Sequence, residues 1–166
     1  LGDLLLRSDD ADAALAAAQS AQSLDPGSID TENLLARVYD ALDRAADSRA
    51  ARQRALALAQ GAVQPAGDEA SPPPPTADAF YRLGDAYLAL DRYDEALAAY
   101  TQAQSLAPTD GRIHLAKGNV YYWQGEGEQA RAEYAAWAQA APKDPAPQLM
   151  LGLLADEAGD AQSAAA

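Results

Sequence analysis

The sequence has no cysteine, one histidine, one phenylalanine, one methionine and two tryptophans. Without cysteine there is neither a disulfide nor a thiolate metal ligand, which fits an oxidising and a reducing compartment equally well. His114 has no second histidine and no spaced carboxylates on one helix face beside it, so we expect no metal site. The serines lack a neighbouring base, and no glycine-rich phosphate loop follows a strand. We therefore expect no catalytic residue, no cofactor and no enzymatic activity.

Positive charge and long apolar runs are also scarce. Twelve Lys and Arg residues stand against 25 Asp and Glu residues, which gives a formal net charge of −13. A chain this acidic repels the phosphate backbone of nucleic acids and anionic membrane surfaces. No apolar run approaches the roughly 18 residues of a membrane span. We therefore expect no nucleic-acid partner and no direct insertion into a membrane.

The stretch from Ala77 to Asp110 carries a pattern typical of two helices joined as a hairpin. Large and small side chains recur one and two turns apart on each helix, and a proline ends the stretch. These residues are Leu83, Gly84 and Tyr87 on the first helix, Ala96, Tyr100 and Ala103 on the second, and Pro108 at the end. No pattern typical of strands occurs, so the hairpin predicts a helical fold.

The same pattern recurs along the chain. A strong copy follows 34 residues later, with Gly118, Tyr121, Ala130, Tyr134 and Pro142 in phase. Weaker copies contain Leu1, Gly2, Ala14, Ala21 and Pro26, then Leu35, Ala36 and Tyr39, and finally Leu151, Gly152, Gly159 and Ala164. Self-similarity at this period is the sequence signature of stacked helical repeats.

This arrangement resembles the tetratricopeptide repeat, a helical hairpin of about 34 residues with a Leu-Gly, Tyr, Ala, aromatic, Pro pattern. The resemblance implies an all-α fold, a right-handed superhelical solenoid of such hairpins. We expect two hairpins over residues 1–60, the first truncated and the second divergent. Residues 61–76 form a Pro-rich insertion, and residues 77–166 hold two full repeats and a truncated third.

The pattern predicts ten helices joined by short turns. They lie near 1–8, 12–25, 29–42, 45–60, 77–90, 94–107, 111–124, 127–140, 146–158 and 160–166. In the hairpin turns, Asp9, Asp43, Asp91 and Gly125 stand where a left-handed residue follows a helix end. The insertion contains Pro72–Pro75 and is not expected to be helical; it is either a plain spacer or a ligand for a proline-recognising domain.

Two groups of polar residues depart from the pattern. His114 and Lys117 stand where the reference hairpin has Phe80 and Leu83. We expect a packed, half-buried histidine, a lysine that extends its charged end to solvent, and Trp137 filling the space beside it. Four arginines, Arg44, Arg49, Arg52 and Arg54, gather on one helix. They form either a solvated face with pairs such as Asp40 to Arg44, or a docking patch for an acidic neighbour.

In the tetratricopeptide family, the first helices of successive hairpins line a concave groove. The resemblance assigns to that groove Tyr81, Asp85, Leu88, Leu115, Asn119, Tyr122, Trp123, Leu149 and Leu153. Aromatic residues without a packing role are typical of binding hot spots. The alternative is that the insertion or neighbouring helices cover Tyr122 and Trp123. Some family members clamp a C-terminal carboxylate with Lys and Arg; those cations are missing here, so an apolar or basic partner segment suits the groove better.

The sequence therefore predicts a non-catalytic scaffold that binds an extended or helical segment of a protein partner in its groove. A second hypothesis is a structural subunit, or a fragment of one, held permanently in a larger complex. A third is a recruiting arm for an enzyme domain outside these residues. The cellular compartment is not predicted.

Overall fold

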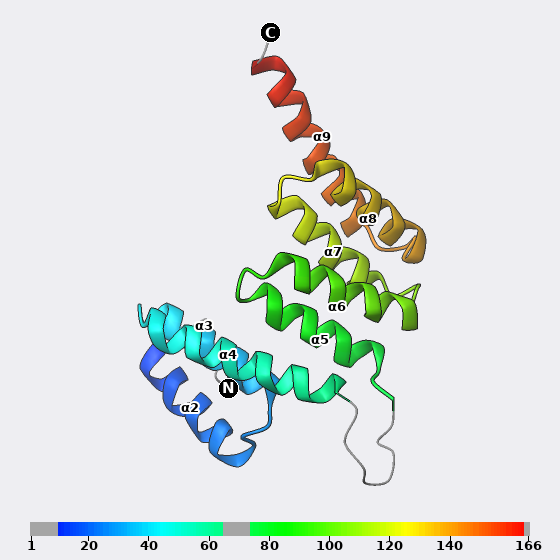
Figure 1. The fold of residues 1–166 in the computed structure, drawn as a ribbon. Coiled ribbons are helices and arrows are strands. Elements are labelled where there is room, and N and C mark those ends of the chain that lie inside the picture. The colour runs from blue at the N-terminus through cyan, green and yellow to red at the C-terminus, as the bar shows by residue number, and fades with distance from the viewer. Residues whose placement is uncertain (1–9, 65–73, 165–166) are drawn as a thin grey trace. The chain divides into compact units, whose positions relative to one another are not determined.

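The computed structural model describes residues 10–64 and 74–164, and these residues form α-helices and no strands (Figure 1). The helices are α2 (Ala11–Leu24), α3 (Ile29–Ala41), α4 (Ala45–Val63), α5 (Ala77–Leu88), α6 (Tyr93–Leu106), α7 (Gly111–Trp123), α8 (Gly127–Ala140) and α9 (Ala146–Ala164). The predicted all-α class is confirmed. The predicted helix at 1–8 and most of the insertion lie outside the described residues.

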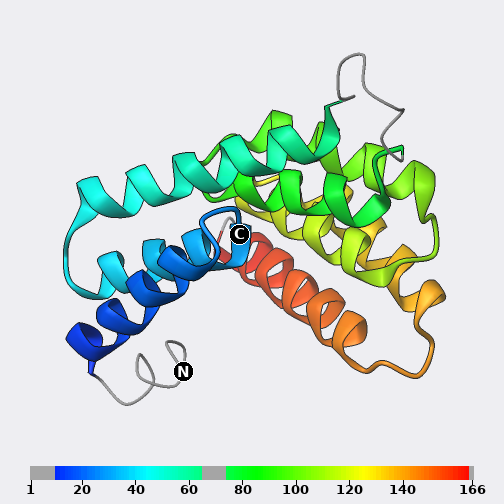
Figure 2. The ribbon, with the colours of Figure 1, turned by 90° about the horizontal axis from the view of Figure 1, so that it is seen from below.

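The chain divides into two compact units, which are described separately. Unit 1 contains the chain up to Pro75 together with Asp85–Arg92. In it α2 packs on α3, and α3 packs on α4 (Figure 2). Small residues, Ala18, Ala36 and Ala51, surround Leu35 in its buried core. Helices that meet through alanine approach closely, which agrees with the alanine-rich sequence.

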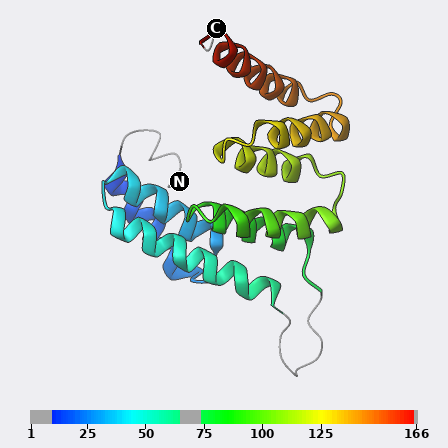
Figure 3. The same ribbon diagram turned by 45° about the horizontal axis from the view of Figure 1, so that its top comes forward.

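Unit 2 contains Thr76–Gly84 and the chain from Tyr93 onward. Its helices α6, α7, α8 and α9 pack in chain order, each on the one before it (Figure 3). The core between α8 and α9 contains Ala130, Tyr134, Trp137 and Leu154, all buried. As predicted, Trp137 is a packing residue.

The first helix of each hairpin in unit 2 meets the second at a glycine. A Cβ atom built on Gly84 would lie 2.4 Å from Cε1 of Tyr100, and one on Gly118 would lie 2.4 Å from Cε1 of Tyr134. Non-bonded carbon atoms do not approach this closely, so only glycine admits the ring. The tyrosines are fully buried. The glycine and tyrosine of the repeat pattern are therefore one contact.

The hairpin turns have the backbone that the sequence predicts. Asp43 (φ 58°), Asp91 (φ 57°) and Gly125 (φ 76°) have left-handed dihedral angles just after α3, α5 and α7. This conformation lets the chain leave the helix while the last carbonyls still accept hydrogen bonds. In the third turn, for example, the N–H of Glu126 donates to the Tyr121 carbonyl at 2.8 Å.

Two predicted helix ends are wrong. α9 runs unbroken to Ala164, whereas the sequence predicted a turn near Gly159. An isolated glycine costs a helix only about 1 kcal/mol relative to alanine, and the residues around Gly159 include no proline that would stop the helix. α4 ends at Val63, so the first residues of the predicted non-helical insertion are helical.

The glycine contacts predict opposite effects for two matched substitutions. Gly118→Ala places a methyl group inside the Tyr134 ring and should lower the free energy of unfolding by about 1–3 kcal/mol. The methyl group of Gly152→Ala would have no atom within 4 Å. This variant should raise the free energy of unfolding by up to about 1 kcal/mol, because alanine favours the helix. Urea unfolding followed by circular dichroism measures both. Equal effects of the two variants would contradict the contact described above.

Candidate functional site

Four of the nine predicted groove residues are exposed large hydrophobic side chains. Tyr122 and Trp123 end α7 with exposed fractions of 39% and 53%, and Leu149 and Leu153 lie one turn apart on α9 with 65% and 51%. All four belong to unit 2. Single exposed apolar side chains are common, whereas a contiguous patch of them is a candidate surface for contact with another protein.

Two other predicted groove residues, Tyr81 and Leu115, are half-buried and have packing roles. The Tyr81 ring lies 5.7 Å from the Tyr100 ring, centroid to centroid, and the Arg112 guanidinium lies 5.3 Å from the Tyr81 centroid. Leu115 packs against the core between α8 and α9. Both side chains therefore contribute to packing within unit 2.

Asn119 is held by the buried tyrosine of its own hairpin. Its Oδ1 accepts a hydrogen bond from the Tyr134 hydroxyl at 2.8 Å. Burial, and secondarily the nearby Tyr122, raise the pKa of Tyr134, so the hydroxyl keeps its proton at neutral pH. This hydrogen bond fixes the orientation of the Asn119 side chain, which lies on α7 about one turn before Tyr122.

The last two predicted groove residues, Asp85 and Leu88, lie on the final turns of α5, which belong to unit 1. Both side chains are half-buried. They are not part of the exposed set on α7 and α9.

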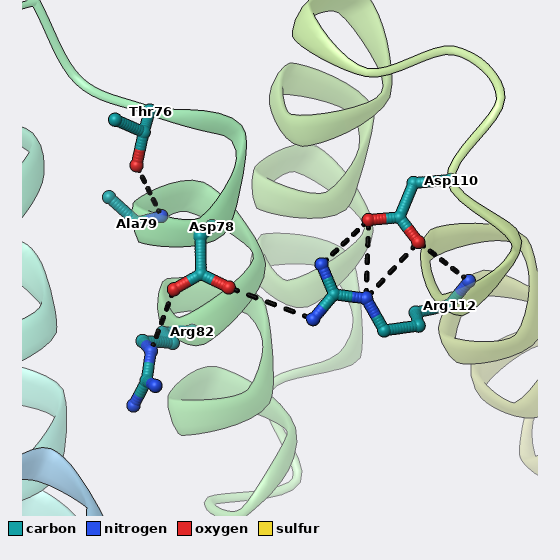
Figure 4. A network of polar contacts seen from close by, with 6 residues as sticks. All are labelled: Thr76, Asp78, Ala79, Arg82, Asp110 and Arg112. Atoms are coloured by element: carbon teal, nitrogen blue, oxygen red, sulfur yellow. Dashed lines mark hydrogen bonds and ion pairs between the residues drawn. The ribbon is translucent and has the colours of Figure 1, made fainter.

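An ion-pair network that the sequence pattern does not indicate ties α5 to the start of α7 (Figure 4). Arg112 Nη2 lies 2.7 Å from Asp110 Oδ2, and Arg112 Nη1 lies 3.7 Å from Asp78 Oδ1. The hydrogen bonds from the Arg112 side chain lower the pKa of Asp110, against the opposing effect of burial. Asp110 in turn raises the pKa of Arg112. The network holds the guanidinium beside Tyr81.

The expectation for Lys117 is wrong: its side chain does not extend to solvent. Lys117 is 8% exposed, and its Nζ lies 2.6 Å from Glu133 Oε1 and 2.9 Å from Gln104 Oε1. His114 packs as expected but is buried rather than half-buried, and its Nδ1 lies 2.8 Å from Glu133 Oε2. The carboxylate of Glu133 gives the lysine a partner inside the protein.

The arginines of α4 form ion pairs, but not the predicted one. Asp40 pairs with Arg52 at 2.6 Å, across the hairpin, rather than with Arg44. Arg44 pairs with Asp47 at 2.7 Å. Arg54 reaches the buried carboxylate of Glu32 at 2.9 Å. Much of the positive charge on α4 is therefore paired within unit 1.

The described residues lack the features of two other kinds of site. They contain no group of three or more His, Asp or Glu side chains that could hold a metal ion. None of their helices combines the length and apolar character that crossing a membrane requires.

The family model of the tetratricopeptide repeat matches residues 77–110. Residues 77–110 are a tetratricopeptide repeat. Proteins built from this repeat are in general interaction scaffolds without catalytic activity, and the chain has their solenoid fold. No curated protein matches the chain in sequence.

Solved structures of tetratricopeptide-repeat type align with most of the chain. A thermophilic tetratricopeptide-repeat protein of Thermus thermophilus aligns with a TM-score of 0.63 and 22% identity over 93% of this chain and 77% of that chain. MamA aligns with a TM-score of 0.55 and 22% identity over 96% and 85%. A chain of the APC/C hetero-tetramer Cut9–Hcn1 aligns with a TM-score of 0.58 and 23% identity over 93% and 28%. Identities this low show the fold alone.

The buried ion pair predicts a cost for removing one partner. Lys117→Leu leaves the Glu133 carboxylate short of a donor and should lower the free energy of unfolding by about 3 kcal/mol or more. Adding Glu133→Ala restores both residues of the preceding repeat, Leu83 and Ala99, and should recover most of the loss. Lys143→Leu, at an exposed lysine, is the control and should change stability by under about 0.5 kcal/mol. Urea unfolding measures all three; a double variant as unstable as Lys117→Leu would contradict the pairing.

The Asp110 carboxyl predicts a pH dependence. Its pKa is below the usual 3.8 in the folded state, so the stabilisation is present above that value and is lost as the pH falls through the folded pKa. Arg112→Gln removes the main cause and should raise the pKa of Asp110, measured from its carboxyl carbon shift by NMR. The pair is partly exposed, so the stability difference at pH 7 should stay under about 1 kcal/mol. Arg82→Gln leaves the Asp110 partners intact and is the control; an unchanged Asp110 titration in Arg112→Gln would contradict the assignment.

Proposed function

We propose that the chain is a non-catalytic protein-binding scaffold whose α7 and α9 faces hold an extended or helical segment of a partner. The observation that carries this proposal is the exposure of Trp123, 53%, at the end of α7. Tyr121, two residues before Trp123, packs against the core between α8 and α9, so Trp123 is not needed to fill that core. A tryptophan that is not used in packing is the side chain most often found as a binding anchor.

The neighbouring side chains indicate the chemistry of the partner segment. Tyr122, Leu149 and Leu153 add exposed apolar surface, which favours apolar side chains in the partner. The formal net charge of −13 favours cationic residues at its margins, through faster association. Asn119 is already engaged by Tyr134, and Trp123 and Leu115 occupy places where a carboxylate clamp needs cations. The proposed partner is therefore an apolar or basic polypeptide, with no cofactor, nucleic acid or membrane insertion involved.

A second proposal is a structural subunit fixed in a larger complex. Two observations favour it: the chain resembles in fold a component of the Cut9–Hcn1 assembly, and Leu24 and Leu106 are exposed by 88% and 54% outside the predicted groove. Light scattering of the purified chain separates the two proposals. A stable monomer supports the scaffold, and obligate association supports the subunit.

The scaffold proposal predicts a selective loss of affinity in Trp123→Ala. Peptides selected from a random library on the immobilised chain supply the ligand, and calorimetric titration supplies the affinity. Trp123→Ala should cost about 2 kcal/mol or more in binding free energy, with little change in melting temperature. Leu106→Ala removes an equally exposed side chain outside the groove and should leave the affinity unchanged.

An unchanged affinity of Trp123→Ala, together with a melting temperature lowered by several degrees, would show that Trp123 packs within the fold. The assignment of the binding surface to α7 would then be withdrawn.

A further inference from the structure

A cavity in unit 1 lies between α4 and the turn that follows α5. Its volume is about 340 Å³, at the lower end of the range for ligand pockets. Residues three and four positions apart on a helix share one face, and the α4 residues of the cavity have this spacing. The main lining residues, all in unit 1, are Arg49, Arg52, Gln53 and Leu56 on α4, and Leu90 and Arg92 in the turn. None of the nine predicted groove residues lines this cavity.

Arg49 lines the cavity without a partner of its own. The other arginines of the α4 group, Arg44, Arg52 and Arg54, each pair with a carboxylate. Arg49 is exposed, and among the residues that the structure describes its guanidinium has no ion pair, hydrogen bond or aromatic contact. Carboxylates are not scarce in a chain with 25 Asp and Glu residues. The donors of Arg49 are therefore available to a ligand.

The fold holds the other two arginines of the cavity in place. Arg52 Nη2 lies 2.6 Å from Asp40 Oδ2. The Arg92 guanidinium lies 4.7 Å from the centroid of the Tyr87 ring, whose hydroxyl accepts a hydrogen bond from Gln60 Nε2 at 3.1 Å. A guanidinium has five N–H donors, so an arginine that already pairs with one carboxylate can donate to a second. Both side chains can therefore donate to the same ligand.

We propose that this cavity, the Arg49 cavity, binds a carboxylate side chain of an acidic polypeptide segment. A guanidinium presents parallel N–H donors that match the two oxygens of a carboxylate, and such bidentate pairs are among the strong hydrogen bonds. Asp91 also lines the cavity, but three arginines outnumber it. The cavity takes the charge opposite to that of the partner proposed for the α7 and α9 faces, so this inference goes beyond the proposed function.

The apolar part of the cavity indicates what accompanies the carboxylate. Leu56 is buried and Leu90 is half-buried, and their surface suits the methylene groups of a glutamate and a leucine beside it. Proteins built from this repeat bind proteins or peptides, which favours a polypeptide over a free small anion. The Pro-rich insertion supplies Asp68 and Glu69, but residues 64–76 contain no leucine, isoleucine, valine, methionine or aromatic residue for the apolar part. The proposed occupant is therefore a separate polypeptide.

A labelled peptide with glutamate residues on either side of a leucine, between glycine and serine spacers, provides the probe. The same peptide with glutamine in place of glutamate is its control, and fluorescence anisotropy with the complete 166-residue chain measures both affinities. At physiological ionic strength, charges farther apart than about 8 Å are largely screened, so repulsion by the net charge of −13 is weak. The glutamate peptide should bind at least about tenfold more tightly, because a carboxylate forms charge-assisted hydrogen bonds that glutamine lacks.

The deciding variant is Arg49→Gln. It removes the unpaired guanidinium, so the affinity for the glutamate peptide should fall at least about tenfold. The melting temperature should stay unchanged, because the arginine is exposed and unpaired. Arg131→Gln is the matched control: it makes the same change in net charge at an exposed arginine of α8 outside the cavity, and should leave the affinity unchanged. Trp123→Ala should also leave it unchanged, which separates this cavity from the proposed binding surface.

Several results would overturn the proposal for the Arg49 cavity. Absence of binding up to millimolar protein concentration, or an equal loss of affinity in Arg49→Gln and Arg131→Gln, would contradict the site. Displacement of the labelled peptide by free glutarate as readily as by unlabelled peptide would assign the cavity to a small dicarboxylate. A melting temperature lowered by several degrees in Arg49→Gln would show that a segment of the chain itself occupies the cavity. A dimer in light scattering that Arg49→Gln dissociates would assign the cavity to a second copy.

Discussion

The contact between a glycine on one helix and a tyrosine ring on the next is the constraint on which the hairpins of unit 2 depend. At Gly84 and Gly118 the ring fills the space of the missing side chain. The ring is large and fully buried, so it supplies apolar burial that alanine-rich helices otherwise lack. It also fixes where the two helices cross. One pair of residues therefore sets both the stability and the geometry of a hairpin.

The hairpin of α7 and α8 keeps this contact but has a buried ion pair where the preceding hairpin has apolar packing. Three positions change together relative to the preceding repeat: Phe80 becomes His114, Leu83 becomes Lys117, and Ala99 becomes Glu133. Each new side chain has a partner among the others, which is the condition for burying charge at an acceptable cost. Because the pair works only when α7 and α8 face each other in one register, we infer that it gives this hairpin a specificity that apolar packing alone lacks.

The sequence predicted what depends on local pattern. Glycine, tyrosine and alanine recur with helical spacing, so most helices and their turns followed from it, whereas the contact of each glycine with a tyrosine ring was not predicted. The sequence did not predict features that depend on contacts with residues on other helices. Considered without its neighbours, Lys117 predicts an ammonium group exposed to solvent. Its burial depends on the ion pair with Glu133, which lies on the next helix. Likewise the sequence did not predict that Tyr100 and Arg112, from later helices, pack against Tyr81. The exposure of Trp123 was foreseeable because Tyr121 already occupies the packing position.

The end of α9 shows the same division between local and distant causes. The repeat pattern predicted a turn at Gly159, but the helix passes through this residue. A single glycine costs a helix only about 1 kcal/mol relative to alanine, so intrinsic propensity lets the helix continue. Among the described residues, no atom lies within 4 Å of the Cβ position of Gly152. The pairing of glycine and ring therefore fixes the hairpins of Gly84 and Gly118, whereas helix propensity determines the course of α9.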